Sequence, residues 1–305
     1  MKIAIVTEKP FAPAAVQGIK QVIEEAGHEM VLVEKGTRDD MLAAVADAAG
    51  LIVRSDKVDA QVFDAAPQLK VVVRAGAGYD NIDLEAATAH GVCVMNTPGQ
   101  NSNAVAELVF GMLVTLVRNR YNGKAGTELK DKTLGIHAFG AVGRNVARIA
   151  KGFGMTVSAL DPFVKDEVMT AEGVTPVHSV EELYSKNQYV SLHIPATAET
   201  RGSVGHKLMA LLPHNGVLIN TARKEIIDEA GLKEALTERE DLRYVADVKP
   251  DNGDELEATF GDRVFFTPKK MGAQTAEANI NAGLAAAHQV VQHLADGWNR
   301  FQVNK

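Results

Sequence analysis

A glycine-containing segment near the middle of the chain, GIHAFGAVGR at residues 135–144, has the composition of a dinucleotide-binding turn. An apolar run precedes it and a helical pattern follows it. In the fingerprint G-x-G-x-x-G, the second glycine lets the backbone approach a pyrophosphate, and the third lets the helix pack closely against the strand. Gly140 and Gly143 occupy these positions, whereas Ala138 stands where the first glycine is usual. The free N–H groups that begin the helix would bind the phosphates. We therefore predict cofactor contacts from Phe139, Gly140, Ala141, Val142 and Gly143.

Asp161 ends the next apolar run, roughly 20 residues beyond these glycines. A carboxylate there accepts hydrogen bonds from the adenosine ribose and repels a 2′-phosphate, so the sequence favours NAD over NADP. Pro162 follows it and joins the predicted cofactor site. The alternative is that Asp161 is only a turn residue before this proline.

Short apolar runs alternate with helical patterns along almost the whole chain. This alternation predicts parallel sheets covered by helices on both faces. A long helix over residues 101–122 separates two such series, and a helix over residues 275–296 closes the chain. The first series predicts five strands, at residues 2–6, 30–33, 50–53, 71–74 and 92–95. The second predicts six, at residues 134–138, 156–160, 189–193, 216–220, 244–247 and 264–267.

Bulk composition excludes several classes of protein. The net charge of −7 and the pI near 5.7 argue against a general nucleic-acid or membrane-surface partner. Cys93 is the one cysteine, so no disulfide forms within the chain and a reducing, cytoplasmic location is expected. No apolar stretch approaches the roughly 20 residues of a transmembrane helix, and we predict no metal site.

Further segments, spread in order over most of the chain, carry a family resemblance. They are VRAGAGYDNID at 73–83, NTPGQN at 96–101 with VAEL at 105–108, VSLHIPAT at 190–197, NTAR at 220–223 with IDE at 227–229, and TP at 267–268. Together they resemble the D-2-hydroxy-acid dehydrogenases, in particular their phosphoglycerate branch. The resemblance implies an α/β protein in which a Rossmann NAD-binding domain, residues 97–276, is inserted into a flavodoxin-like substrate domain, residues 1–96 and 277–305. It also implies a homodimer formed through the helix at residues 101–122.

The resemblance assigns roles to particular residues. Arg223 matches the catalytic arginine, whose planar cation suits a 2-hydroxy carboxylate. Arg54 and Arg74 would bind a substrate phosphate, although Arg54 could instead be a solvated charge at a strand end. The other implied substrate contacts are Ser55, Ala75, Gly76, Ala77, Gly78, Asn101 and Lys270, and the other implied cofactor contacts are His193, Ile194, Pro195, Thr200, Thr221, Ala222, Asp247, Gly272 and Ala273.

The chain departs from the family at the acid/base position. The family's Thr-Pro-His-x-Gly is replaced by TPKKMGA at residues 267–273, and its glutamate is missing from DVKPDNG at residues 247–253. A histidine base benefits from a carboxylate partner. A lysine base needs the opposite, because an ordinary lysine pKa of about 10.4 is too high and neighbouring cations lower it. Losing both residues together is therefore coherent if Lys269 is the base, with Lys270 as the alternative.

The expected activity is oxidation of 3-phospho-D-glycerate to 3-phosphohydroxypyruvate with NAD, the first step of L-serine synthesis. One alternative is another 2-hydroxy-acid dehydrogenase, such as a glyoxylate or hydroxypyruvate reductase, whose substrate would not need Arg54. A second alternative is a non-catalytic NAD-sensing scaffold, which the missing histidine and glutamate would allow and the retained Arg223 opposes.

Overall fold

The structure is a computed structural model that describes residues 1–304. The chain forms two compact units. Unit 1 comprises Met1–Asn101 and the segment from Gln274 onward, and unit 2 comprises Ser102–Ala273. The sequence predicted that the boundaries between the two units lie at residues 96/97 and 276/277. Each unit has its own apolar cores and is described by itself.

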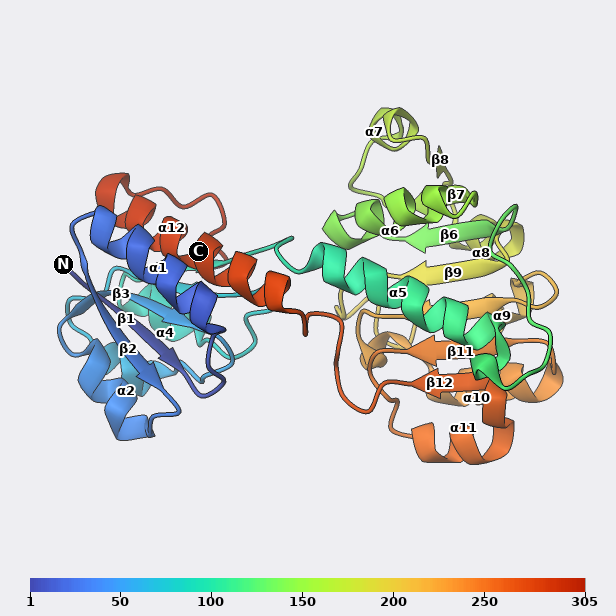
Figure 1. Ribbon diagram of the computed structural model, residues 1–305, viewed down its shortest axis with the longest axis horizontal. Helices are drawn as coiled ribbons and strands as arrows, with labels where there is room; N and C mark the ends of the chain where they lie inside the picture. The colour runs from blue at the N-terminus through green and yellow to red at the C-terminus, as the bar shows by residue number, and fades with distance from the viewer. Residues whose placement is uncertain (305) are drawn as a thin grey trace. The chain divides into compact units, whose positions relative to one another are not determined.

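Unit 1 contains a five-stranded parallel sheet in the order β2-β1-β3-β4-β5, which is the flavodoxin-like order. Its central strands are apolar on both faces because helices cover both faces. Helices α1 (Pro13–Glu25) and α12 (Ala276–Asp296) lie side by side on one face (Figure 1). Residues of α2 (Arg38–Val45), α3 (Ala60–Asp64) and α4 (Leu84–Ala89) pack in the core of the other face. The strands are β1 (Lys2–Thr7), β2 (Glu29–Glu34), β3 (Ala48–Val53), β4 (Val71–Arg74) and β5 (Cys93–Asn96).

The last described residues of the chain protect one edge of this sheet. The Val303 N–H donates to the Val94 carbonyl over 2.8 Å. The buried Asn304 amide accepts from the Val94 N–H over 2.8 Å and donates to the Val92 carbonyl over 2.9 Å. Strand β5 therefore presents no open row of backbone groups along this stretch.

Unit 2 contains a seven-stranded parallel sheet in the order β12-β11-β10-β9-β6-β7-β8. This is the doubly wound Rossmann arrangement, with the change of direction between β6 and β9, so the predicted fold class is confirmed. The predicted count of six strands was wrong, because β8 is a two-residue edge strand that contains a proline and leaves no apolar run to detect. The strands are β6 (Thr133–His137), β7 (Thr156–Leu160), β8 (Thr175–Pro176), β9 (Tyr189–Leu192), β10 (Val217–Asn220), β11 (Arg243–Ala246) and β12 (Val264–Phe266).

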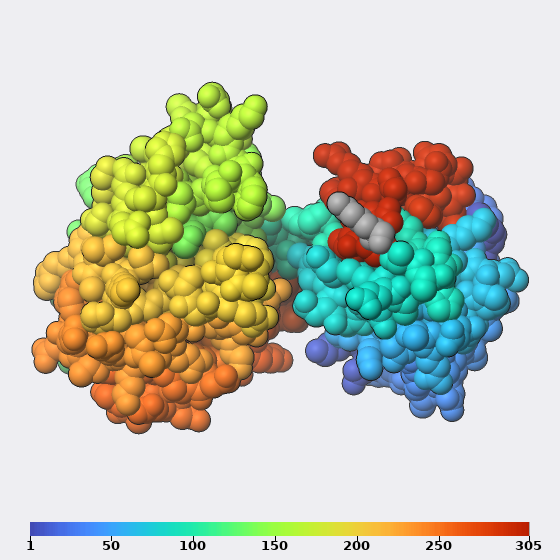
Figure 2. Space-filling model, turned by 180° about the vertical axis from the view of Figure 1, so that it is seen from behind, coloured from blue at the N-terminus to red at the C-terminus, as the bar shows by residue number. Residues whose placement is uncertain are grey.

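Helices cover both faces of this sheet. Helices α5 (Ser102–Val117) and α6 (Ala141–Gly152) share one core (Figure 1). The opposite core is built with α8 (Val180–Lys186), α9 (His206–Leu211), α10 (Glu229–Glu238) and α11 (Gly253–Phe260). The segment with α7 (Asp166–Ala171) and β8 projects from the body of the unit, as its yellow-green surface in Figure 2 shows.

The predicted helix over residues 101–122 was too long. It ends at Val117, and the short helix η1 (Asn119–Tyr121) follows with φ angles of 52°, 51° and 56° at its three residues. These left-handed conformations cannot continue an α-helix. No glycine or proline marks the end of the helix in the sequence, because the first glycine after Val117 is Gly123. The other short helices are η2 (Lys224–Ile226) and η3 (Gly261–Arg263).

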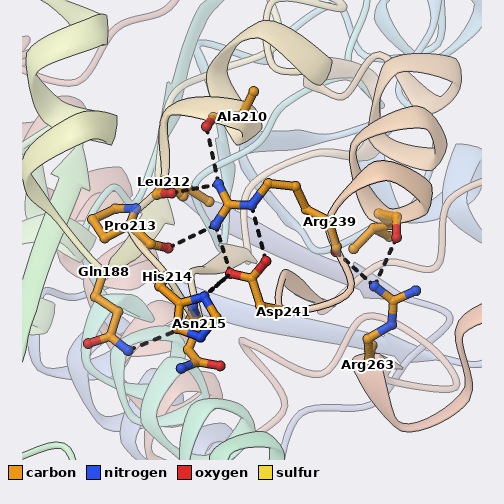
Figure 3. Close-up of polar contacts among 10 residues, drawn as sticks. Gln188, Ala210, Leu212, Pro213, His214, Asn215, Arg239, Asp241 and Arg263 are labelled. Atoms are coloured by element: carbon orange, nitrogen blue, oxygen red, sulfur yellow. Dashed lines mark hydrogen bonds and ion pairs between the residues drawn. The ribbon is translucent and has the colours of Figure 1, made fainter.

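A half-buried ion pair joins loops at the opposite, amino-terminal edge of this sheet (Figure 3). Arg239 binds both oxygens of Asp241, at 3.1 and 2.7 Å, and donates to the carbonyls of Leu212 and Ala210 at the end of α9. The Asn215 N–H donates to Asp241 over 2.8 Å. A cavity of about 250 Å³ also lies at this edge, lined by Lys132, Gln188, Tyr189 and Arg243 among others. Both features lie away from the strand ends that carry the predicted cofactor residues.

Candidate active site

The carboxyl ends of the parallel strands in unit 2 carry a row of polar side chains. His137 ends β6, His193 follows β9, Thr221 follows β10 and Asp247 follows β11. Ligands of doubly wound folds bind at this edge, near the change of direction between β6 and β9. Most residues of unit 2 predicted from the sequence to bind the cofactor lie at or just beyond these strand ends.

The turn from β6 to α6 has the shape that a pyrophosphate requires. A Cβ added to Gly140, the residue before α6, would meet no atom within 4 Å. A Cβ added to Gly143 would lie 2.3 Å from the Ala138 carbonyl oxygen, so only glycine fits there. The open side of Gly140 and the N–H groups at the start of α6 therefore fit an NAD pyrophosphate, and Phe139, Ala141 and Val142 surround this turn.

Ala138 adopts a φ of 86°, a conformation that favours glycine. The fingerprint therefore keeps the backbone geometry of its first glycine although the residue is alanine. Its N–H donates to the Leu160 carbonyl over 2.9 Å, which joins the turn to β7.

Asp161 lies directly beside this turn. One carboxylate oxygen accepts from the Phe139 N–H over 2.8 Å, and the other accepts from the Phe163 N–H over 2.9 Å. Each oxygen keeps a further lone pair, so the carboxylate can still accept from ribose hydroxyls. Pro162 beside it is exposed.

Two histidines lie behind the turn, and both are neutral at neutral pH. Burial lowers the pKa of His193 to about 3 and that of His137 to about 4. His193 Nε2 lies 3.0 Å from Ser191 Oγ, and its Nδ1 lies 3.5 Å from Thr221 Oγ1. Groups with such low pKa values are poor bases near neutral pH, which supports structural roles for both.

The loop that follows His193 is closed by a threonine. Thr200 Oγ1 accepts from the Thr197 N–H over 2.7 Å and donates to the Pro195 carbonyl. Ile194 is buried and Pro195 is exposed, and both lie just beyond the carboxyl end of β9.

Arg223 lies just beyond β10 and is half-buried. Its Nη1 donates to the Ala222 carbonyl over 2.9 Å. Within residues 1–304 its guanidinium has no carboxylate partner, so its charge is available to an anionic ligand. The buried Asn220 at the end of β10 bonds to the backbone of Ala222 and Arg223. The sequence interpretation missed this role of Asn220, although the residue stands in the segment that carries Arg223.

Lys269 and Lys270 are both exposed on the loop after β12. The carboxylates in the segment after β11 are bound to other lysines: Asp251 to Lys224, and Asp254 and Glu257 to Lys249. Asp247 is fully buried and binds the backbone of Met271 and Gly272. The loop is therefore held by a carboxylate through its backbone, and Ala273 continues from it half-buried.

In unit 1, Arg54 is firmly held. Its Nη1 donates to the carbonyls of Lys9 and Pro10, each over 2.8 Å, its Nη2 donates to Asn279, and its guanidinium lies 5.1 Å from the centre of the Phe11 ring. Burial lowers the pKa of this guanidinium from its ordinary value. Arg54 is thus half-buried and ordered, which speaks against the alternative of a freely solvated charge.

Arg74 lies next to Arg54, since its Nε donates to the Arg54 carbonyl over 2.9 Å. In the loop that follows, the N–H groups of Ala75 and Gly76 are bonded to the carbonyls of Val53 and Arg74. Among the described residues, those of Ala77 and Gly78 have no acceptor. Two cations and two available amides therefore gather at the carboxyl ends of β3 and β4. Ser55 is exposed beside them, and Asn101 is the last residue of this part of unit 1.

Comparison with known proteins agrees with this geometry. Residues 110–268 match the model of the D-isomer specific 2-hydroxyacid dehydrogenase NAD binding domain, which confirms the predicted NAD cofactor. A D-3-phosphoglycerate dehydrogenase of Methanocaldococcus jannaschii is 37% identical over 90% of this chain and 55% of its own length. The chain thus spans about half the length of the curated relatives it matches.

Solved structures resemble the whole chain. An NAD⁺-bound 3-phosphoglycerate dehydrogenase of Entamoeba histolytica is 49% identical, with a TM-score of 0.88 over 100% of this chain and 99% of that one. A D-lactate dehydrogenase of Escherichia coli is 25% identical, with a TM-score of 0.77 over 99% of this chain and 100% of that one. Since the family model covers half of the sequence and the surrounding fold agrees, this chain belongs to the D-isomer specific 2-hydroxyacid dehydrogenase family.

Proposed function

We propose that this chain is an NAD-dependent dehydrogenase that oxidises 3-phospho-D-glycerate to 3-phosphohydroxypyruvate, the reaction that begins L-serine synthesis. The observation that carries the proposal is the ordered pair of Arg54 and Arg74 beside the available amides of Ala77 and Gly78. A phosphorylated carboxylate has two anionic ends, and these groups supply donors for one or both of them. The names of the relatives from M. jannaschii and E. histolytica support this substrate class.

The site residues divide the chemistry between them. Arg223 binds the substrate carboxylate and the C2 oxygen, which orients the carbon that loses hydride. Lys269 takes the proton of the C2 hydroxyl on its amine, and Lys270 is the alternative base. NAD, when bound, would supply the acceptor for the hydride that leaves C2. The turn at Gly140–Gly143, Asp161 and the residues around His193 hold the dinucleotide.

The base hypothesis predicts a dependence on pH. A lysine base must be unprotonated to act, and ordinary lysines are protonated below about pH 10. Oxidation should therefore quicken as the pH rises from 7 to 9. Lys269→Ala should lower kcat by at least about 100-fold. If Lys270→Ala lowers kcat by this amount and Lys269→Ala does not, Lys270 is the base.

The decisive measurement is NADH absorbance with phosphohydroxypyruvate, glyoxylate and hydroxypyruvate offered separately. We expect turnover with the first to exceed that with the other two. Arg54→Ala should raise the KM for phosphohydroxypyruvate and leave that for glyoxylate nearly unchanged. Preference for an unphosphorylated acid would assign the chain to a different dehydrogenase, and failure with all three would favour a non-catalytic NAD-binding scaffold.

We also propose that the chain works as a cytoplasmic homodimer that pairs through α5. The outward side of this helix includes Gly111, where an added Cβ would meet no atom within 4 Å. Among the described residues, no helix is long and apolar enough to cross a membrane. Sedimentation equilibrium should give twice the chain mass, and Gly111→Arg should shift it toward the mass of one chain.

A further inference from the structure

Two buried polar side chains at neighbouring strand ends hold the two loops that carry the active-site cations. We propose that Asn220 and Asp247 are positioning residues, which fix Arg223 and the Lys269–Lys270 loop for catalysis without touching the substrate. This inference rests on the proposed function, because it assigns catalytic roles to those cations.

Asn220 ends β10 and is 2% exposed. Its side-chain oxygen accepts from the Ala222 N–H over 3.0 Å, while its side-chain nitrogen donates to the Arg223 carbonyl over 2.9 Å. The one side-chain amide of Asn220 thus binds the backbone of two successive residues of the loop, Ala222 and Arg223. Neither an ionised aspartate nor an apolar residue can make both bonds, because the carboxylate only accepts and the apolar side chain does neither.

Asp247 follows β11 and is fully buried. One carboxylate oxygen accepts from the Met271 N–H over 2.7 Å and from Thr267 Oγ1 over 3.0 Å. The other accepts from the Gly272 N–H over 2.8 Å. These hydrogen bonds hold the loop after β12 against the end of β11.

Gly272 permits this close approach. A Cβ at that position would lie 2.9 Å from the Asp247 carboxylate and 3.2 Å from Val105 Cγ2. The lysines immediately before Met271 thereby gain a fixed backbone, although their own side chains are exposed.

The two anchors are joined directly, since the Asp247 N–H donates to the Asn220 carbonyl over 2.9 Å. The loops that carry Arg223 and the two lysines are therefore both attached to one pair of adjacent parallel strands, β10 and β11. A displacement of about 1 Å in a catalytic group can lower turnover about 100-fold. Attaching both loops to the same pair of strands would keep the spacing between their cations constant.

This role differs from a direct contact with the nicotinamide amide, which the family resemblance implied for Asp247. In the structure the carboxylate is buried, one oxygen accepts from the Met271 N–H and Thr267 Oγ1 and the other from the Gly272 N–H, so the contacts present are those to the loop. The two roles separate in steady-state kinetics, because a positioning residue affects kcat and a cofactor ligand affects the KM for NAD.

The test compares Asp247→Asn and Asn220→Asp with two matched variants at the opposite edge of the same sheet. Asn187→Asp disturbs an equally buried amide that donates to Ser158 and Leu183, and Asp241→Asn disturbs an acid that binds Arg239. We expect the two anchor variants to lose about 10- to 100-fold in kcat with the KM for NAD changed less than about threefold. The matched variants should lose stability and keep kcat. Thr267→Val removes the hydroxyl that bonds the Asp247 carbonyl over 2.7 Å and its carboxylate over 3.0 Å but leaves both backbone N–H bonds, so it should give a smaller loss if Asp247→Asn does not fold.

Hydrogen exchange of the peptides that contain residues 221–223 and 267–273 provides a readout that is independent of turnover. Exchange should accelerate in the first peptide for Asn220→Asp and in the second for Asp247→Asn, and in neither peptide for the matched variants. Unchanged exchange, or an unchanged kcat with a raised KM for NAD, would overturn the inference. A wild-type protein that turns over none of the three acids would refute the proposed function instead, while exchange would still report whether the anchors hold the loops.

Discussion

Ala138 is a residue whose backbone conformation conflicts with its type. A φ of 86° costs a residue with a Cβ about 1–2 kcal/mol. Glycine avoids this cost, although it also gives the unfolded chain more conformational freedom, which offsets part of the gain. Ala138→Gly should therefore raise the free energy of unfolding by about 0.5–1 kcal/mol, measured by urea denaturation. Gly143→Ala should act in the opposite direction, because its Cβ would lie 2.3 Å from the Ala138 oxygen. A destabilised Ala138→Gly variant would show that the surrounding turn prefers the methyl group.

We expect Asp161 to favour NAD over NADP. Its carboxylate is held beside the phosphate-binding turn by the N–H groups of Phe139 and Phe163. Removing the charge removes the repulsion of a 2′-phosphate and also a ribose acceptor. Asp161→Ala should lower the ratio of kcat/KM for NAD to that for NADP by at least about tenfold, a change of about 1.4 kcal/mol. An unchanged ratio would return Asp161 to the alternative of a simple turn residue.

At the scale of elements, the ion pair of Arg239 and Asp241 secures the ends of α9 and α10. The bond from Arg239 lowers the pKa of Asp241 to about 2, from an ordinary value of 3.8, and the Asp241 side chain is 17% exposed. A lowered carboxylate pKa stabilises the fold above pH 3.8, and this contribution is lost as the pH falls through about 2. Asp241→Asn should therefore cost about 2 kcal/mol of unfolding free energy at pH 7, and about half of that at pH 3.

Urea denaturation of both proteins at several pH values between 7 and 3 measures this difference. A gap that stays constant over the range would mean that the asparagine loses packing or hydrogen bonds, and that the charge of Asp241 contributes little. Lys186→Ala is a suitable comparison, because its exposed ion pair with Glu182 should contribute less than about 1 kcal/mol.

The sequence predicted the longer elements because their periodicity is strong. Strand β3, for example, is buried along its whole length, so its continuous apolar run can be recognised from the local sequence alone. Strand β8 and the end of α5 escaped, since the first is two residues long and the second is set by the left-handed backbone at Asn119–Tyr121. Arg223 and Lys269 were predicted from local sequence, whereas the bonds that hold their loops could not be. The bonds from Asp247 to Met271 and Gly272 join residues that are far apart in sequence and meet only when β11 and β12 lie side by side.

At the scale of the whole molecule, the two units differ in how continuous they are. Unit 2 is one uninterrupted segment, and both of its cores are made from residues within it. Unit 1 is completed by the far end of the chain. Ala282, Ala286, Ala287 and Val290 of α12 are almost completely buried in its core with residues of α1. Val303 and Asn304 also bind its edge strand.

This difference predicts how the chain can be divided. A fragment of residues 102–273 should fold cooperatively and bind NAD, because its sheet, both helix layers and the turn at Gly140–Gly143 are present. A fragment of residues 1–101 should not fold alone, because the apolar face of its sheet that α12 covers would be exposed to water. Circular dichroism during thermal unfolding and calorimetric titration with NAD measure both outcomes. Adding a peptide of residues 274–305 should restore folding of the shorter fragment, since it returns α12. A cooperative transition of residues 1–101 without that peptide would mean that α1 and the five strands form a sufficient core by themselves.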